Sequence, residues 1–480
     1  MKMCWSRRDF LFRSGGGVSG LALAWLLNQD RLLAGEALTA GAACDASPVG
    51  FNPYAPRPPH FKPRATSVIS LFMSGGVSHV DTFDPKPALA KYAGQPLDGK
   101  IAGDLVVRQG FPGPLMPSPF TFKKYGQSGM EVSELFPHIA GHVDEIAFVR
   151  SVYGQSNDHV QATYEMQTGQ TRMGFPSVGS WVTYGLGSEN ASLPGYVVIH
   201  DARGGPLGGV NDWSSGFIPA AYQGTLFRST GDPIVDLKPS AGVSPEQQRT
   251  RLDLLAKLNE LDMQQYPGNS DLAARISSYE LAFRMQSCAP EALDVSRESE
   301  VTRKLYGLDE TVTEPFGRQC LMARRFAERG VRFIQCTHSY KWDQHGNLKV
   351  DHARNAEEVD QPIAALLTDL KSRGLLDDTL ILWGGEFGRT PVAQGDDGRD
   401  HNPQGYTMWL VGGGVKPGIR YGETDDYGYY AVKDKVHLHD LHATMLHLLG
   451  LNHEKLTYRY AGRDFRLTDV SGQVAQEIIA

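Results

Sequence analysis

The sequence predicts an α/β fold in which a mostly parallel sheet has helices on both faces. Short, uniformly apolar runs that end in glycine, such as SVISLFMSGG at residues 67–76, are typical of parallel strands that are buried on both faces. Amphipathic helical stretches separate these runs, and this alternation is the pattern of α/β crossover units. The chain has 480 residues, of which 41% are hydrophobic, so it is long enough to bury one large core.

Further strands are predicted at residues 145–153 (EIAFVRSVY), 194–200 (PGYVVIH), 331–338 (VRFIQCTH) and 379–383 (TLILW). The helix before the last strand has one apolar face, because its aliphatic residues lie three or four positions apart. These residues are Val359, Ile363, Leu366 and Leu370. Asn355 is the candidate N-cap of this helix and Gly374 its candidate end. Helix, short loop and strand therefore form one crossover unit.

A helical segment interrupts this pattern between residues 244 and 310. Ser244 and Gln247 have the spacing of a capping box, and Pro245 suits the first helical position. The residues YPGNS at 266–270 end the first helix, and a second helix is predicted from Asp271 to Gln286. We therefore expect one α/β domain at residues 66–480, with a helical insertion near residues 244–310.

The amino terminus resembles a signal for export by the twin-arginine route. Arg7 and Arg8 precede a weakly hydrophobic stretch at residues 18–27, and the small residues AGA at 40–42 offer a cleavage site. We expect a signal peptide at residues 1–43, recognition by the twin-arginine translocation machinery, and a periplasmic or extracellular protein. The proline-rich residues 44–65 are expected to form a linker on the domain surface.

Charge and hydrophobicity argue against two classes of partner. The formal net charge is −7, and the sequence has no stripe of basic residues that would neutralise a phosphate backbone. The apolar stretch near the amino terminus is too short to cross a bilayer. We therefore expect no binding to nucleic acid and no stable membrane span.

Histidine and carboxylate side chains gather in segments that follow the predicted strands. Ligands of open α/β sheets bind beyond the carboxyl ends of the strands, so we expect these segments to lie on one rim. Histidine combined with carboxylate suits a divalent ion such as zinc, manganese or iron, while calcium and magnesium remain open. The candidate metal ligands are His79, Asp81, Asp343, His345, Glu386, Asp400 and His401.

The order of these segments resembles that of the alkaline phosphatase and sulfatase superfamily. The helix and strand before Glu386 are similar to the elements that lead to the superfamily's Asp-His-Gly motif, and DHNPQGYTMWLVGGG at residues 400–414 is similar to its late histidine and following strand. The segments SGGVSHVDTFDPKP, GGEFGRTP, GRDHNP and GRDFRLTDV resemble an exported bacterial branch of that superfamily called domain of unknown function 1501. The resemblance covers most of residues 66–452 and implies an alkaline-phosphatase-like three-layer sandwich.

The chain departs from the superfamily at positions that carry its chemistry. Ser74 stands where the first strand usually ends in a metal-binding Asp, and Glu386 and Phe387 stand where the superfamily has Asp-His. His159 occupies the position of the sulfatase nucleophile, nine residues before Thr168. A histidine there is either a nucleophile or a metal ligand, and it cannot form the formylglycine of sulfatases.

The sequence supports two hypotheses about function. In the first, the protein is an exported metal-dependent hydrolase of phosphate or sulfate esters, on small molecules or polysaccharides, with His159 and Arg389 as catalytic residues. Arg389 would clamp an oxyanion, and an ion pair with a neighbouring carboxylate is an equal alternative. In the second, catalysis has decayed, as Ser74 and Phe387 suggest, and the exported protein binds a partner at the cell surface.

Glu386 follows a buried strand, where a carboxylate without a partner would be costly to desolvate. It must therefore face a metal, an arginine such as Arg389, or water. Because the resemblance places Glu386 at the position of a metal-binding Asp, we expect it to converge with Asp343 and His401 in one small site, with His159 facing it from the start of a helix. The alternative is an ion pair between Glu386 and Arg389 at the surface.

Overall fold

A computed structural model describes residues 53–480, except for residues 109, 231–233, 235–236, 238–241 and 267–269. The expected signal peptide at residues 1–43 and the first part of the expected linker, residues 44–52, lie outside the described residues. Residues 53–65 lie against the α/β domain: the N–H of Arg57 donates to the carbonyl of Leu186, and the N–H of Arg64 donates to the carbonyl of Leu448.

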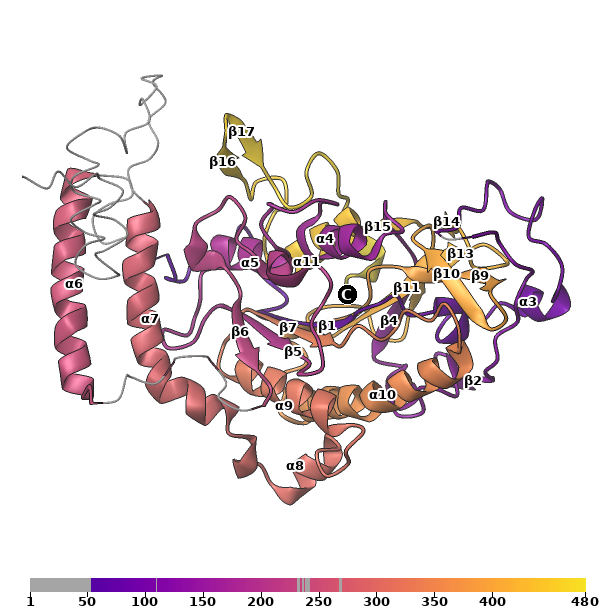
Figure 1. Cartoon of the computed structure of the whole chain (residues 1–480), viewed down its shortest axis with the longest axis horizontal. Coiled ribbons are helices and arrows are strands. Elements are labelled where there is room, and N and C mark those ends of the chain that lie inside the picture. The colour runs from indigo at the N-terminus through magenta and orange to yellow at the C-terminus, as the bar shows by residue number, and fades with distance from the viewer. Residues whose placement is uncertain (1–52, 109, 231–233, 235–236, 238–241, 267–269) are drawn as a thin grey trace, which may run out of the picture. The chain divides into compact units, whose positions relative to one another are not determined.

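A mixed sheet lies at the centre of the domain (Figure 1). In order across the sheet, the strands are β12 (Arg420–Tyr421), β4 (Ile146–Tyr153), β11 (Tyr406–Val411), β8 (Thr379–Gly384), β1 (Ser67–Met73), β7 (Phe333–His338), β5 (Tyr196–His200) and β6 (Thr225–Arg228), with β15 (Val436–His437) beside β4. The five strands from β8 to β6 run parallel, whereas β11 is antiparallel to both of its neighbours.

The carboxyl ends of the three central strands are level. Met73, the last residue of β1, pairs with His338, the last residue of β7. Phe72 pairs with Gly384 at the end of β8. The segments that follow these strands therefore begin on one rim of the sheet, where ligands of α/β proteins bind.

Helices cover both faces of the sheet and complete three layers (Figure 1). One face carries α9 (Glu314–Glu328) and α10 (Leu348–Ser372), and the other carries α4 (His159–Thr168), α5 (Val178–Leu186) and α11 (Leu438–Leu448). Side chains of β1 alternate between the two cores, with Ile69 and Leu71 in the first and Val68 and Phe72 in the second. The predicted three-layer α/β fold, with its mostly parallel sheet, is confirmed.

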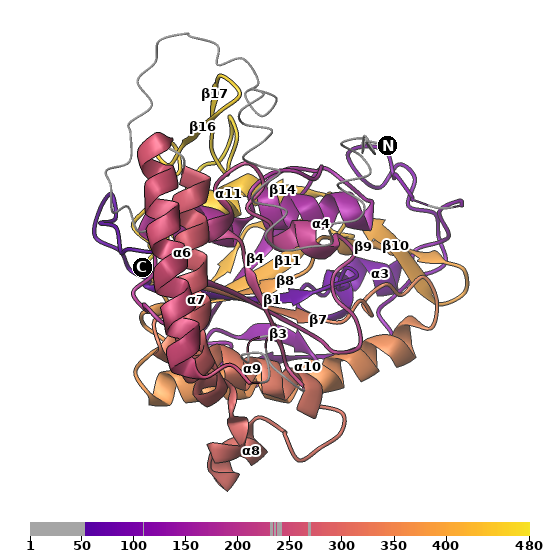
Figure 2. The same cartoon turned by 60° about the vertical axis from the view of Figure 1, so that its left-hand side comes forward.

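Two long helices, α6 (Pro245–Gln265) and α7 (Ser270–Leu293), lie side by side beyond the β6 edge of the sheet (Figures 1 and 2). The hydroxyl of Ser244 accepts a hydrogen bond from the N–H of Gln247, and the Gln247 side chain completes the predicted capping box. Both helices lie within residues 244–310, the expected range of the insertion, which also contains α8 (Glu300–Leu305).

The helix α10 begins earlier than the sequence predicts. It starts at Leu348 rather than near Asn355, because the Asn355 amide donates to the carbonyl of Lys341 and does not cap a helix. It ends before Gly374, as predicted, and Gly374 has a φ of 68°.

Shorter elements surround the sheet. They are α3 (Pro87–Lys91), β2 (Phe122–Tyr125), β3 (Met130–Ser133), β9 (Gly388–Gln394), β10 (Gly398–Asn402), β13 (Glu423–Thr424), β14 (Ala431–Lys433), β16 (Tyr458–Tyr460) and β17 (Arg463–Phe465). Among them, β9 and β10 form an antiparallel hairpin just after β8. Within the described residues, no helix has both the length and the apolar character needed to cross a bilayer.

Candidate metal centre

Four side chains from three segments converge on the rim of the sheet. His159 is the first residue of α4, Asp343 and His345 lie in the loop between β7 and α10, and His401 lies in β10. One donor atom from each residue lies within 4.8 Å of the donor atoms of the other three. Asp343 and His345 keep 22% and 28% of their side-chain surface exposed, so the group is open to solvent on one side.

The donor atoms are spaced like ligands of a single ion. Oδ1 of Asp343 lies 2.9 Å from Nε2 of His345 and 3.2 Å from Nε2 of both His159 and His401. The Nε2 atoms of His345 and His401 are 3.0 Å apart. Ligands at about 2.0 Å from a tetrahedral zinc ion are about 3.3 Å from one another, so these four distances are close to those around such an ion, and the remaining donor pairs lie within 4.8 Å.

The three imidazole rings are also turned correctly for metal binding. In each ring, Nδ1 faces an acceptor oxygen: Oε1 of Glu386 at 2.8 Å from His159, the carbonyl of Asn157 at 2.7 Å from His401, and the side-chain oxygen of Gln394 beside His345. Each acceptor favours a proton on Nδ1, which leaves the Nε2 lone pair free for an ion. Two such lone pairs only 3.0 Å apart repel each other unless a cation lies between them.

The charges around Asp343 reinforce this arrangement. Burial would raise the pKa of the Asp343 carboxyl, but its contacts with the three histidines and the charge on Arg389 hold that pKa well below its usual range. Burial would lower the pKa of His159, but the neighbouring carboxylates of Asp343 and Glu386 raise it. Burial prevails at His401 and lowers its pKa. The site therefore keeps an ionised carboxylate among the rings.

Two glycines let backbone and side chains approach closely here. Gly75 has a φ of 118°, and a Cβ there would lie 2.7 Å from the backbone nitrogen of Trp342. At Gly388, which begins the hairpin that carries His401, a Cβ would lie 2.5 Å from Nδ1 of His79. Larger residues at either position would push the metal-site loops apart.

Glu386 lies behind a ligand and outside the group of four. Its side chain is fully buried, and its Oε1 accepts hydrogen bonds from Nδ1 of His159 and, at 2.9 Å, from the N–H of Gly75. Glu386 thus converges with the site as expected, but it orients the His159 ring and is not among the four clustered donors.

Arg389 forms the ion pair with a neighbouring carboxylate that was one of its two expected roles. Its side chain is fully buried, and its guanidinium donates to the carbonyls of Gly75, Gly76, Trp342 and Arg399. Its ion-pair partner is Asp343, at 2.8 Å, and not Glu386. All its nitrogens are engaged within the protein and its side chain is buried, so Arg389 is not accessible to a substrate oxyanion.

His79 and Asp81 also remain outside the cluster. Nε2 of His79 lies 2.7 Å from the carbonyl of Gly428, and the fully buried Asp81 carboxylate pairs with Arg399, whose Nε lies 2.7 Å from Oδ2. Burying these charges together satisfies both and ties the segment after β1 to the β9–β10 hairpin. Neither residue therefore belongs to the group of four.

Asp400 precedes a ligand but does not itself reach the group. Its carboxylate accepts hydrogen bonds from the N–H of His401, at 2.8 Å, and from the N–H of Arg108. Tyr340 is a further neighbour of the group that no sequence motif marks, and its hydroxyl donates to Oδ2 of Asp343 at 2.6 Å. Its position three residues before Asp343, in the same strand-end loop, was the available indication.

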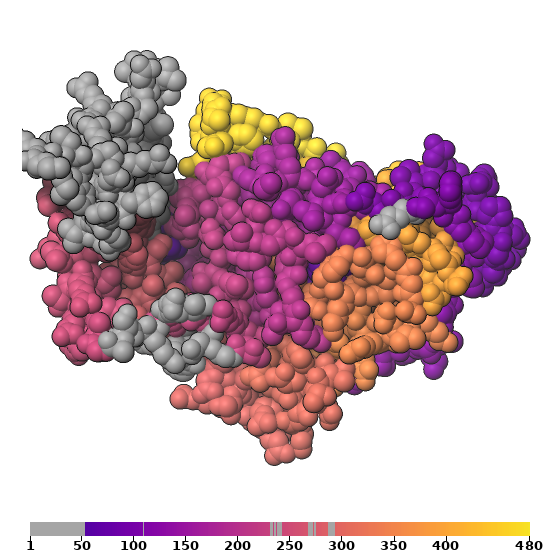
Figure 3. Space-filling view, viewed as in Figure 1, coloured from indigo at the N-terminus to yellow at the C-terminus, as the bar shows by residue number. Residues whose placement is uncertain are grey.

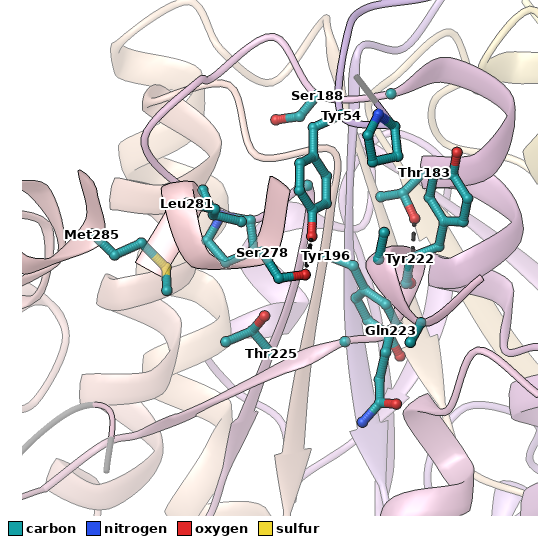
Figure 4. A pocket seen from close by; sticks show the side chains of 17 residues that line it. Tyr54, Thr183, Ser188, Tyr196, Tyr222, Gln223, Thr225, Ser278, Leu281 and Met285 are labelled. Atoms are coloured by element: carbon teal, nitrogen blue, oxygen red, sulfur yellow. Dashed lines mark hydrogen bonds between the residues drawn. The ribbon is translucent and has the colours of Figure 1, made fainter. Parts of the chain in front are cut away.

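Two ligand-sized cavities lie away from this rim and contain none of the candidate residues. One cavity, of about 390 Å³, lies between α7 and the amino ends of β5 and β6, and none of its lining residues has a charged side chain. A 3.1 Å hydrogen bond joins Tyr54 and Ser278 in its lining (Figure 4). The other, of about 550 Å³, lies beside α10 and is lined by the carboxylates of Glu134, Glu310, Glu357 and Asp360. Neither offers positive charge to an anionic ester.

Comparison with known proteins places the chain in a family. No curated protein matches the sequence. Among solved structures, the chain is similar to a sulfatase from Pseudoalteromonas sp. (13% identity, 82% of this chain and 69% of that chain, TM-score 0.35) and to a phosphonate monoester hydrolase from Silicibacter pomeroyi (12%, 80% and 73%, 0.36). It is also similar to an alkaline phosphatase from the Antarctic bacterium TAB5 (10%, 77% and 96%, 0.32). The model of the family described as "Protein of unknown function (DUF1501)" matches residues 65–479, nearly the whole described chain, so the protein belongs to that family.

Proposed function

We propose that the protein is an exported hydrolase of phosphate or sulfate esters that depends on one divalent metal ion. His159, Asp343, His345 and His401 would hold the ion. The observation that carries this proposal is the orientation of the three rings, each with Nδ1 against an acceptor and Nε2 toward Asp343 or toward another Nε2. Three imidazoles and one carboxylate suit zinc or manganese best.

A bound ion would supply a Lewis acid and a water of lowered pKa. In this arrangement His159 is a ligand and not the nucleophile, because Nδ1 faces Glu386 and Nε2 faces Asp343. No other side chain among the described members of the cluster is left to attack an ester, so the attacking group is water. The exposed edges of Asp343 and His345 leave a side from which water and substrate can enter.

In this proposal the site would hold one ion and not the pair that the resemblance to alkaline phosphatases implies. The ring of Phe387 stacks on His401 with centroids 4.5 Å apart and lies 4.8 Å from the ring of His159. This ring fills space where the superfamily motif has a second histidine. Ser74, in the place of the other ligand, is fully buried.

The second candidate is a metal-binding protein of the cell surface without turnover. The loss of the second ion's ligands at Ser74 and Phe387 favours it. The two candidates predict the same metal content and differ only in hydrolysis.

Metal analysis of the exported protein tests the common part of both candidates. We expect about one equivalent of transition metal in the wild type, loss of that metal in His401→Ala, and no loss in His447→Ala, a histidine on α11 outside the cluster. Hydrolysis of p-nitrophenyl phosphate or p-nitrophenyl sulfate by the loaded protein then distinguishes an enzyme from a binding protein. Wild-type protein that folds normally and takes up no metal would refute the proposed site.

A further inference from the structure

An arginine on a surface segment lies between the residues that precede two of the proposed ligands. The guanidinium Nη2 of Arg108 lies 2.7 Å from Oδ2 of Asp158, and its backbone N–H donates to Asp400. Asp158 directly precedes His159, and Asp400 directly precedes His401. Arg108 therefore lies at the edge of the metal centre, although it is far from all four ligands in the sequence.

Hydrogen bonds on both sides of Arg108 hold its segment against the rest of the domain. The hydroxyl of Tyr429 lies 2.8 Å from the N–H of Val106 and 3.2 Å from its carbonyl. Downstream, Gly113 donates to the carbonyl of Ala393 in β9. Figure 3 shows this violet part of the chain packed against the orange surface of the hairpin. The position of Arg108 is thus determined from both ends of the segment.

Arg108 is also a basic residue with free donors. Arg389 is fully buried, with every nitrogen engaged, and Lys341 is bound to both oxygens of Glu358, at 2.8 and 3.1 Å. Arg108 keeps 44% of its side-chain surface exposed. Its Nε and Nη1 make no hydrogen bond to any described residue.

The ion pair with Asp158 can open without disturbing α4. Oδ1 of Asp158 caps the helix by accepting from the N–H groups of Val160 and Gln161, whereas Oδ2 takes Arg108. An exposed pair of this kind contributes little stability. A tetrahedral oxyanion offers the guanidinium two parallel, charge-assisted hydrogen bonds in exchange.

We infer that Arg108 binds the anionic group of the substrate beside the metal centre, and that the substrate is an ester which keeps a charged, tetrahedral phosphoryl or sulfuryl group. This inference rests on the proposed function. It assigns to Arg108 the role that the sequence suggested for Arg389. A neutral carboxylic ester would offer Arg108 no such partner.

Anion binding to the metal-loaded, full-length mature protein tests the inference. Isothermal titration with inorganic phosphate and, separately, with sulfate distinguishes the two sources of the anion. Arg108→Ala should weaken binding of the preferred anion tenfold or more, and Arg108→Lys, which keeps the charge but loses the planar fork, should fall between. Metal content should equal that of the wild type in both variants.

Arg303→Ala is the matched control. Arg303 pairs with Asp309 at 2.7 Å and is likewise 44% exposed, but it lies on α8, away from the site. Its anion affinity should stay within twofold of the wild type. If Arg108→Ala binds the anion as tightly as the wild type, the inference fails while the proposed function stands. If the loaded wild type binds neither anion, both fail.

Discussion

Replacing Glu386 with glutamine tests how the metal centre is built. Glu386 orients His159 by accepting the proton of Nδ1 at 2.8 Å, and it also accepts from the N–H of Gly75. Glutamine keeps the size and one acceptor oxygen but loses the charge, so the ring is held less firmly and its Nε2 becomes a weaker donor. Loss of such a supporting contact typically lowers metal affinity 10- to 100-fold, which corresponds to about 1.4–2.7 kcal/mol.

Competition with a fluorescent chelator measures this affinity directly. The matched control is Glu358→Gln, because Glu358 also holds a buried histidine, with Oε2 2.9 Å from Nε2 of His338, and both side chains are at most 3% exposed. His338 is not among the four donors. We therefore expect Glu358→Gln to reduce thermal stability and to leave metal affinity unchanged.

Comparing the metal affinities of these two variants tests whether Glu386 acts on the metal centre itself. A Glu386→Gln protein that binds metal as tightly as the wild type would refute the role of Glu386 in orienting His159. An equal loss of affinity in both variants would mean that the effect is a general loss of structure and not a property of the site.

The remaining predictions concern stability, pH, metal removal and export. The Asp81–Arg399 ion pair is fully buried, so Asp81→Ala should lower the free energy of unfolding by about 3–5 kcal/mol, because it leaves an uncompensated charge; a loss below about 1 kcal/mol in urea denaturation would contradict this. Burial lowers the pKa of His442 to about 3, so below pH ~6.5 the unfolded chain binds a proton that the folded protein does not. The free energy of unfolding should therefore fall as the pH is lowered from about 6 towards 3. In His442→Gln, the free energy of unfolding, measured by denaturation at several pH values, should depend less steeply on pH. An unchanged dependence on pH would contradict this role of His442. Removing the metal with a chelator should lower the melting temperature, and added zinc should restore it. A melting temperature that does not change when chelator is added would contradict a bound ion. Replacing Arg7 and Arg8 with lysine should keep the protein in the cytoplasm, and cell fractionation that still finds it exported would exclude the twin-arginine route.

Local pattern was sufficient to predict the fold and the identity of most proposed ligands. Uniformly apolar runs mark β1, β7 and β8 because strands covered on both faces have no polar side to present. The polar residues just after them must begin on one rim, since parallel strands end together. For that reason Asp343, His345 and His401 could be expected near one another, whereas His159 was placed by the resemblance to the sulfatase nucleophile position.

The role of each charged residue on that rim was decided only by the tertiary structure. Glu386 and Arg389 are three residues apart in the sequence, yet one faces His159 and the other faces Asp343. Asp81, a candidate ligand by sequence, is neutralised by Arg399, 318 positions away, and Arg108 reaches the site from a segment with no recognisable motif. A buried charge is tolerated only beside a partner that compensates its desolvation. Which residue supplies that partner depends on contacts between distant segments, and these contacts form only when the chain has folded.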